Sequence, residues 1–174
     1  MKHLAISLTG NSIADEVVQE AWVSAMRGLP KFERRSSLKT WLLRIVANEA
    51  KTRLRKENRM VSLDAMTAED SDMSDRFNNT GHWEKTPNQW DTDSPEGILA
   101  TAELQACINE LIENLPDMQS ATLSLRENQG HSLAEICNIL DVSESNVRVL
   151  LHRARNRLFC CIEHFQETGE CCTT

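Results

Sequence analysis

The chain has 174 residues, 40% of them hydrophobic, and a formal net charge of −7 at pH 7. This length fits one ordinary domain or two small ones, and the apolar content permits real cores. No run of about eighteen apolar residues predicts a membrane span, and Met1–Gly10 lacks the basic flank and cleavage site of a secretory signal. We therefore expect a cytoplasmic protein with no membrane insertion of its own.

The negative net charge would argue against a nucleic-acid ligand if it were spread evenly, but it is not. Between Arg27 and Arg59 there are eleven Lys and Arg against three acidic residues, whereas Met60–Ser120 has two against thirteen. Basic charge is thus concentrated in one segment, where it could meet phosphates.

The first periodic segment is Ser12–Met26, where apolar residues recur at helical spacing with acidic and amide residues between them. The apolar positions are Val17, Val18, Ala21, Trp22 and Ala25. Gly28 and Pro30 end this amphipathic helix, and a basic loop, Lys31–Ser37, follows it.

A second helix is predicted from the apolar stripe Leu38, Trp41, Leu42, Ile45, Val46 and Ala50. Ser36 or Ser37 is expected to be the N-cap. Trp41 is expected to pack in the core rather than to stack on a DNA base. The helix ends in basic residues, which suit either DNA or the negative end of a helix dipole.

Residues 60–94 form an acidic, polar segment without a sustained period, which predicts a flexible linker. It contains three large aromatic residues, Phe77, Trp83 and Trp90, which a purely solvating spacer would not need.

Helical periods return in Ile98–Leu115 and in the shorter Gln119–Arg126, and no convincing strand interrupts them. His131–Leu158 then shows helix-turn-helix spacing, and Ser143 can cap the second helix. Its apolar face consists of Leu133, Ile136, Leu140, Val142, Val147, Leu150, Leu151, Ala154 and Leu158. An ordinary helical hairpin is the alternative.

Two pairs of sequence motifs, one in each half of the chain, resemble the extracytoplasmic-function (ECF) group of bacterial sigma-70 factors. Ala14–Ala21 with Ser37–Ile45 is similar to region two of that group, and Leu133–Ile136 with Val147–Arg155 is similar to its region four. The linker residues Phe77, Gly81–Trp83, Pro87 and Trp90 resemble a pattern found in one subset of these factors. The resemblance implies an all-α fold of two small helical domains, a region-two bundle and a region-four helix-turn-helix, joined by the acidic linker.

The domain boundaries implied are 1–59 for region two, 60–94 for the linker, 95–165 for region four and 166–174 for a cysteine-containing tail. The segment before Gly10 is short for the family's first helix, so we expect either that this helix is truncated or that the chain starts upstream. The implied function is an alternative sigma factor that binds core RNA polymerase and directs initiation at promoter DNA, under the control of an anti-sigma factor.

In the family, region two binds a coiled coil of the largest polymerase subunit. By position, the polymerase contacts would be Asp15, Glu16, Val18, Gln19 and Glu20. An acidic face flanked by apolar residues suits a basic partner helix; an exposed amphipathic face without a partner is the alternative.

For the minus-ten element, the resemblance implies capture of a flipped base by Arg34, Arg35 and Ser36, in the loop Phe32–Ser37. The residues expected to follow the DNA strands are Asn48, Lys51, Arg53, Arg55 and Lys56. Glu33–Arg35 departs from the family's usual glycine and acidic residue, which leaves base preference open.

For the minus-thirty-five element, the resemblance implies contacts from the last helix. The residues are Ser145, Asn146, Arg148, Val149, His152, Arg153 and Arg155. Val149 departs from the commoner small polar residue, so the promoter sequence cannot be inferred.

Six cysteines are present. Cys107 and Cys137 lie in amphipathic helical patterns and are expected to be reduced core thiols. The tail offers Cys160, Cys161, His164, Cys171 and Cys172 as weak candidates for metal or redox sensing, but their spacing fits no common zinc finger. No metal and no cofactor are therefore expected.

Two other classes of protein compete with the sigma factor. Enzymes are disfavoured because no glycine-rich phosphate loop, HExxH or GxSxG motif is present. A stand-alone helix-turn-helix regulator would bind a palindromic DNA duplex without polymerase. A cysteine-tail metal sensor would change its affinity for DNA or polymerase when zinc is added or chelated. The basic segment Arg27–Arg59 favours the sigma factor, because a ligand-sensing domain has no need of it.

Overall fold

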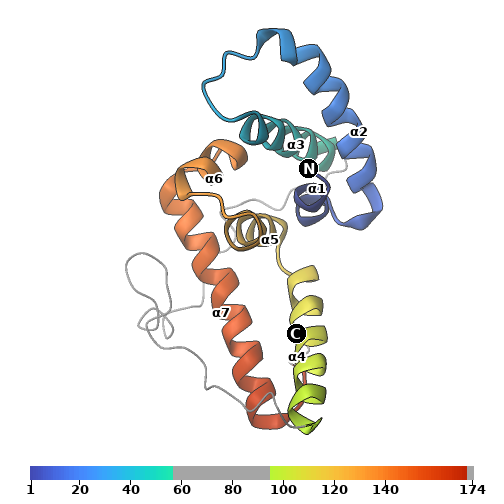
Figure 1. Cartoon of the computed structure of the whole chain (residues 1–174), viewed down its shortest axis with the longest axis vertical. Helices are drawn as coiled ribbons and strands as arrows, with labels where there is room; N and C mark the ends of the chain where they lie inside the picture. The colour runs from blue at the N-terminus through green and yellow to red at the C-terminus, as the bar shows by residue number, and fades with distance from the viewer. Residues whose placement is uncertain (57–94, 172–174) are drawn as a thin grey trace. The chain divides into compact units, whose positions relative to one another are not determined.

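The computed structural model describes residues 1–56 and 95–171, which form two compact units (Figure 1). The first unit holds 1–56 and 116–150, and the second holds 95–115 and 151–171. Every regular element in these ranges is helical, which confirms the all-α prediction for the described residues. Among the described helices, none combines the length and hydropathy that a membrane span requires. The linker residues Phe77, Trp83 and Trp90 lie outside the described ranges.

Three helices begin the first unit: α1 (Lys2–Thr9), α2 (Asn11–Gly28) and α3 (Leu38–Lys56). Gly10 joins α1 to α2 with a φ of 75°, a left-handed conformation that costs glycine little. The three helices pack on one another around an apolar core. Its residues include Leu4, Leu8, Ala14, Val17, Ala21, Leu43, Val46 and Ala47.

The predicted apolar faces of α2 and α3 are partly wrong. On α2 the buried face follows Ala14, Val17, Ala21 and Ala25, which places Trp22 one position off it, with 50% of its surface exposed. On α3 the buried face includes Leu43, so Leu38 is 48% exposed and Trp41 is only half-buried. Both segments contain adjacent apolar residues, and periodicity alone could not select the face that faces the core.

The rest of the first unit consists of α5 (Asp117–Leu123), a π-helical turn (Ser124–Asn128), α6 (Leu133–Leu140) and the start of α7 (Glu144–Thr168). Their buried residues include Leu125, Ile136, Ile139, Leu140 and Val147, largely as the helix-turn-helix pattern predicts. Within this unit α6 packs against α3, and α5 packs against α1.

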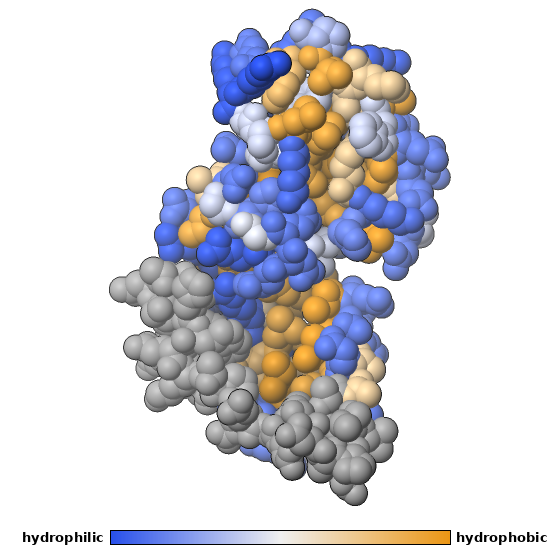
Figure 2. All heavy atoms as spheres, in the orientation of Figure 1, coloured by the Kyte–Doolittle hydropathy of each residue, from blue (hydrophilic) through white to orange (hydrophobic). Residues whose placement is uncertain are grey.

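The second unit pairs α4 (Pro95–Glu113) with the C-terminal part of α7. Figure 2 shows apolar side chains between these two helices. Buried residues in this unit include Leu104, Cys107, Phe159, Cys161 and Phe165. Cys107 is only 3% exposed, but it forms a disulfide with Cys171, so the prediction of a reduced core thiol is wrong for this residue. Its bonded partner lies 64 residues away, a distance over which sequence periodicity gives no signal.

Candidate polymerase and promoter interfaces

The outer face of α2 carries most of the predicted polymerase contacts. Asp15, Glu16, Gln19 and Glu20 are exposed, and Val18 is half-buried beside them. Two ion pairs tie the N-terminal end of this face to neighbouring helices: Lys2 with Asp15 at 2.9 Å and Arg53 with Glu16 at 2.8 Å. The helix thus presents carboxylate and amide groups on one side.

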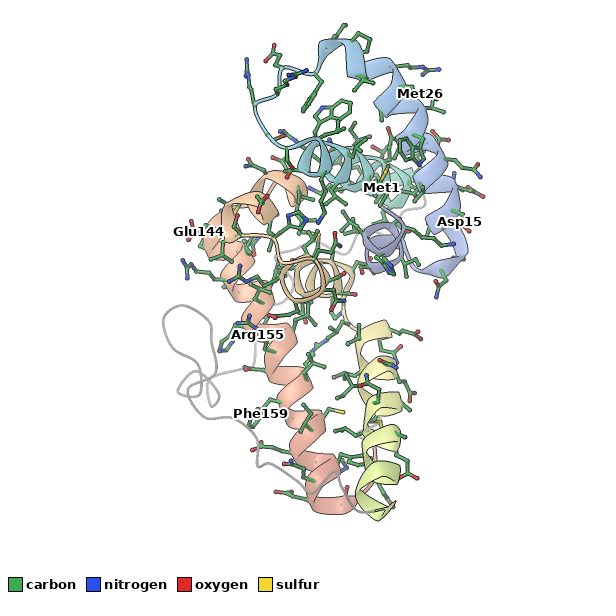
Figure 3. All side chains as sticks on the ribbon, viewed as in Figure 1. Met1, Asp15, Met26, Glu144, Arg155 and Phe159 are labelled. Atoms are coloured by element: carbon green, nitrogen blue, oxygen red, sulfur yellow. A yellow bond between two sulfur atoms is a disulfide. The ribbon has the colours of Figure 1, made fainter. Side chains whose placement is uncertain are left out.

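An apolar surface that the sequence did not predict continues this face. Trp22, Val23 and Met26 are exposed by 50%, 42% and 66%, and Leu29 in the following 3-10 turn (Leu29–Lys31) by 53%. In Figure 3, Asp15 and Met26 both lie at the outer edge of α2. Large apolar side chains exposed next to one another mark interaction surfaces. Side-chain exposure was the missing signal, because the sequence assigned Trp22 to the core.

Between α2 and α3 lies a charged groove. It is lined by Glu16, Val17, Glu20, Glu49, Thr52, Arg53 and Lys56. The hydroxyl of Ser24 donates a 2.6 Å hydrogen bond to Glu49, which fixes that carboxylate on the α2 side of α3.

The loop between α2 and α3 is anchored at both ends. Phe32 packs on Trp41 with ring centroids 5.0 Å apart, and a Cβ at Gly28 would come within 3.2 Å of the same indole. At the other end Ser37 caps α3, since the backbone N–H of Thr40 donates to the Ser37 hydroxyl at 3.0 Å. Trp41 therefore holds the loop in place.

The middle of the loop is exposed. Arg34, Arg35 and Ser36 are all open to solvent, and Arg35 pairs with Glu33 at 2.6 Å. Arg34 has a φ of 56°, in the left-handed region that a branched or long side chain rarely adopts. The loop can offer guanidinium and hydroxyl groups to a strand, at the cost of local backbone strain.

The five predicted DNA residues of α3 divide into two groups. Asn48, Arg55 and Lys56 are exposed. Arg53 pairs with Glu16, and the Lys51 ammonium donates a hydrogen bond to the backbone carbonyl of Leu140 on α6. Burial lowers the pKa of Lys51, while the nearby Asp141 raises it and Arg55 lowers it further. In this arrangement Lys51 and Arg53 are engaged within the protein.

Both helices of the helix-turn-helix are capped. Ser132 begins α6 with a capping box: the Glu135 N–H donates to the Ser132 hydroxyl at 3.3 Å, and the Ser132 N–H donates to the Glu135 carboxylate at 2.9 Å. Asp141 ends α6 with a φ of 55°, and Ser143 accepts a 3.3 Å bond from the N–H of Asn146. The predicted cap at Ser143 is thereby confirmed.

α7 exposes some of the predicted minus-thirty-five residues and covers others. Ser145, Arg148 and Val149 are exposed, while Asn146, His152 and Arg153 are half-buried. Arg155 is buried, with 9% of its surface exposed, so it is not presented to solvent in the structure as described. Arg148 pairs with Glu144 at 2.6 Å.

The tail residues suggested as weak metal candidates are only partly gathered: Cys161 and Cys171 lie close together, with Cys107, whereas Cys160 and His164 are not part of this group. Cys160 and His164 are exposed, whereas Cys161 is buried and Cys171 is bonded to Cys107. Cys172 lies outside the described residues. Cys137 is a free thiol on α6, as its helical pattern predicted, but it is half-buried rather than a core residue.

Comparison with known proteins finds two family models, in the order that the sequence motifs predict. The family model described as "Sigma-70 region 2" matches residues 1–60, and "Sigma-70, region 4" matches 105–158. The chain is 32% identical to an ECF RNA polymerase sigma-E factor of Haemophilus influenzae, over 85% of this chain and 73% of that protein. It is 34% identical to the Escherichia coli K12 sigma-E factor over 82% of this chain and 70% of that protein.

A solved structure shares the fold. It is the sigma factor RpoE from Bartonella quintana in complex with the anti-sigma factor NepR, with a TM-score of 0.56 and 22% sequence identity over 97% of this chain and 91% of that one. With both family models in order and relatives above 30% identity, the chain belongs to the ECF group of the sigma-70 family of RNA polymerase sigma factors.

Proposed function

We propose that this chain is an alternative sigma factor in which residues 1–59 bind core RNA polymerase and the minus-ten element, and residues 95–165 read the minus-thirty-five element. Residues 60–94 would then link the two domains, with 166–174 as a tail. Sigma factors are transcription initiation factors, and we propose that this chain has no enzymatic activity of its own. Because transcription takes place in the bacterial cytoplasm, we assign the chain to that compartment.

The single observation that carries this proposal is the composite face of α2. Asp15, Glu16, Gln19 and Glu20 provide charge and amide groups, and Trp22 and Met26 provide apolar area directly beside them. Such a face fits a partner helix that carries both basic and apolar residues, because charges set the register while apolar area supplies affinity. We assign to it the docking of core polymerase.

For the minus-ten element, the exposed residues Arg34, Arg35 and Ser36 would contact the melted strand from the anchored loop, and Asn48, Arg55 and Lys56 would follow the backbone. Phosphate contacts of this kind position a protein on DNA, whereas the loop would read an extruded base. Lys51 and Arg53 join this set once their partners on α6 and α2 release them.

For the minus-thirty-five element, Ser145, Arg148 and Val149 are the exposed reading residues at the start of α7. An arginine can contact a guanine edge, and an aliphatic side chain can contact a thymine methyl. His152 and Arg153, one to two turns further on, would extend the contacts; Arg155 needs a rearrangement to take part.

The RpoE chain was solved with an anti-sigma factor, and relatives of this chain are sigma-E factors. We propose that an anti-sigma factor also regulates this chain, by covering the α2 face or the promoter-reading residues until a signal removes it.

The test is a titration of the fluorescently labelled full chain with core RNA polymerase, followed by anisotropy. We expect saturable binding, weakened at least about tenfold in a Gln19→Ala, Glu20→Ala double variant, which corresponds to about 1.4 kcal/mol. The matched control is Glu103→Ala with Gln105→Ala, which removes the same two residue types from exposed positions on α4 and should leave the affinity unchanged.

A folded chain that does not bind polymerase but binds a palindromic DNA duplex tightly would overturn the proposal and favour the stand-alone regulator. Equal losses in the test and control variants would show that docking uses a different face.

A further inference from the structure

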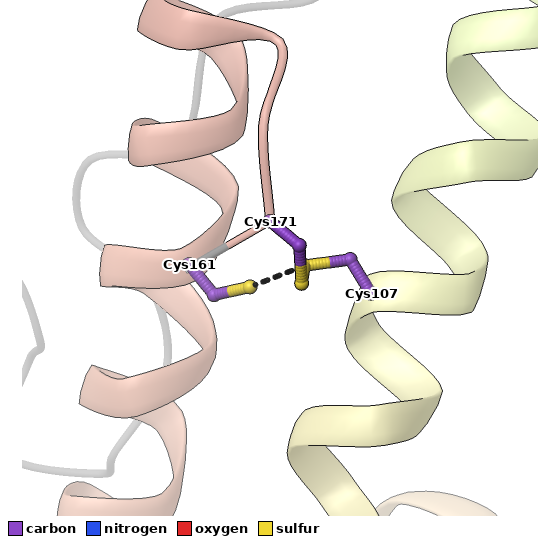
Figure 4. Close-up of side chains that lie close together, drawn as sticks. All are labelled: Cys107, Cys161 and Cys171. Carbon is purple, nitrogen blue, oxygen red and sulfur yellow. Dashed lines mark hydrogen bonds between the residues drawn. A yellow bond between two sulfur atoms is a disulfide. The ribbon is translucent and has the colours of Figure 1, made fainter. Parts of the chain in front are cut away.

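Three cysteines that are distant in sequence meet in the second unit. Cys107 lies on α4, Cys161 on α7, and Cys171 in the segment after α7 (Figure 4). Their sulfur atoms all lie within 4.8 Å of one another. Cys107 and Cys171 are joined in the disulfide, and the Cys161 thiol lies 3.2 Å from the Cys107 sulfur.

A specific turn brings Cys171 back onto the helices. Gly169 follows α7 with a φ of 73°, and its N–H donates to the carbonyl of Phe165 at 2.8 Å. The N–H of Glu170 then donates to the Thr168 hydroxyl at 3.1 Å. These bonds end the helix and turn the chain, so that Cys171 reaches α4.

The site is shielded from solvent. Cys107 is 3% exposed, Cys161 is 0% exposed, and Cys171 is half-buried. Cys160, which directly precedes Cys161 on α7, points about 100° away from it around the helix axis and is exposed. The sulfur cluster therefore consists of one residue from each of three segments.

The redox state decides what such a cluster does. Disulfides are rare in cytoplasmic proteins, where thioredoxin- and glutathione-type thiols keep cysteines reduced. A dithiol reductant would convert the disulfide into two thiols and become a disulfide itself. The inference takes only this reducing compartment from the proposed function.

We propose that the reduced chain binds one thiophilic d10 metal ion, Zn²⁺ or Cu⁺, through the thiolates of Cys107, Cys161 and Cys171. Thiolate sulfur is the ligand that both ions prefer. Zinc–sulfur bonds of about 2.3 Å place tetrahedral sulfurs about 3.8 Å apart, and the Cys161 sulfur lies 3.2 Å from that of Cys107. Reduction of the disulfide would let the Cys171 sulfur move to a similar distance. Each thiol loses its proton on binding, so three thiols and one ion give a tris-thiolate complex and three protons.

Occupancy would cross-link α4, α7 and the tail. An ion that binds only the folded state stabilises it in proportion to the logarithm of its concentration over the dissociation constant. Because α7 also carries Arg148 and Val149 at its other end, the metal would hold the C-terminal part of the promoter-reading helix on α4.

The experiment uses the full chain, reduced anaerobically, with the reductant removed by anaerobic desalting before any metal is added. Co²⁺ is added as a coloured substitute for Zn²⁺ and then displaced by Zn²⁺; Cu⁺ is added in a parallel arm against a chromophoric Cu⁺ chelator. We expect one ion per chain, thiolate-to-cobalt charge-transfer absorption and a higher Tm with zinc. The two titrations give the affinity of the reduced site for each ion.

Variants locate the site. Cys107→Ser, Cys161→Ala and Cys171→Ser should each weaken binding by at least about tenfold, since loss of a ligand exceeds the effect of losing a residue behind it. Cys137→Ser and Cys160→Ser are the controls and should bind as the unchanged chain does. Circular dichroism of each variant checks that it is folded.

A second readout needs no variant. Bound metal should slow alkylation of Cys107, Cys161 and Cys171, measured by mass spectrometry, but leave the rate at Cys137 unchanged, where burial already raises the thiol pKa. The proposal is overturned if the reduced chain binds neither ion, or if the control variants lose binding as much as the test variants do. Neither outcome bears on polymerase docking, which the anisotropy titration measures separately.

Discussion

The ammonium group of Lys51 on α3 donates a hydrogen bond to the backbone carbonyl of Leu140, the last residue of α6. Leu140 ends a helix, where unpaired carbonyls and the helix dipole both favour a cation. The same lysine is one of the residues proposed to follow minus-ten DNA. A phosphate that draws the ammonium toward DNA would draw it away from this carbonyl, so we expect DNA and the α3–α6 contact to compete for Lys51.

Replacing Lys51 tests this competition. We expect Lys51→Gln to loosen the α3–α6 contact by about 1–2 kcal/mol, because a hydrogen bond from a charged donor is lost. Faster amide hydrogen exchange in α6 and in the facing part of α3 would report the loosening.

Lys56→Gln is the matched control, since Lys56 is an exposed lysine on the same helix. Both substitutions remove one positive charge and should weaken promoter binding by similar, salt-dependent amounts. Unchanged exchange in Lys51→Gln would mean that this hydrogen bond does not stabilise the contact.

Arg34 supplies a prediction about strain in the minus-ten loop. With a φ of 56°, this residue should favour glycine, so Arg34→Gly is expected to be more stable than Arg34→Ala by about 1 kcal/mol in chemical denaturation. Both variants lose the same charge, so their promoter affinities should fall together. At Arg35, which has no positive φ, alanine should be at least as stable as glycine. The same order at both positions would contradict the strain argument.

The helices and the helix-turn-helix could be predicted from sequence because they are local. Gly28 and Pro30 end α2, Ser37 and Ser143 cap α3 and α7, and apolar spacing gives the helical period without reference to the rest of the chain. The family motifs added the roles of the exposed residues.

Properties that depend on packing could not be predicted in the same way. Four features depend on which helices pack together. They are the exposure of Trp22, the burial of Arg155, the hydrogen bond from Lys51 to Leu140, and the proximity of Cys107, Cys161 and Cys171. No local pattern encodes a contact over 54 or 89 residues.

The capping box of α6 predicts a pH dependence. Hydrogen bonds from the backbone and side chain of Ser132 lower the pKa of Glu135 from its ordinary value. A carboxyl with a lowered folded-state pKa contributes stability above its unfolded pKa and loses it as pH falls through the folded one. The stability advantage of the unchanged chain over Glu135→Gln, which keeps an acceptor without the charge, should therefore be present at pH 7 and be lost as the pH falls below the ordinary glutamate pKa and through the lowered one. Thermal melts of both proteins across this range would measure it. A gap in Tm that does not change with pH would exclude the charge as its source.

The ion pair at the start of α7 gives a test of promoter reading. Glu144 holds Arg148 at 2.6 Å, and its carboxylate lies on the face proposed to meet DNA. Glu144→Gln should remove the ion pair with Arg148 and a charge that repels DNA, which we expect to strengthen holoenzyme binding to minus-thirty-five DNA by about two- to tenfold, or about 0.4–1.4 kcal/mol. Arg148→Ala should weaken binding and reduce the slope of log K against log salt by about one if the guanidinium meets a phosphate. The double variant separates the two causes, because a gain that acts through Arg148 disappears when Arg148 is absent. A gain of the same size in the Arg148→Ala background would show that Glu144 acts by repulsion alone.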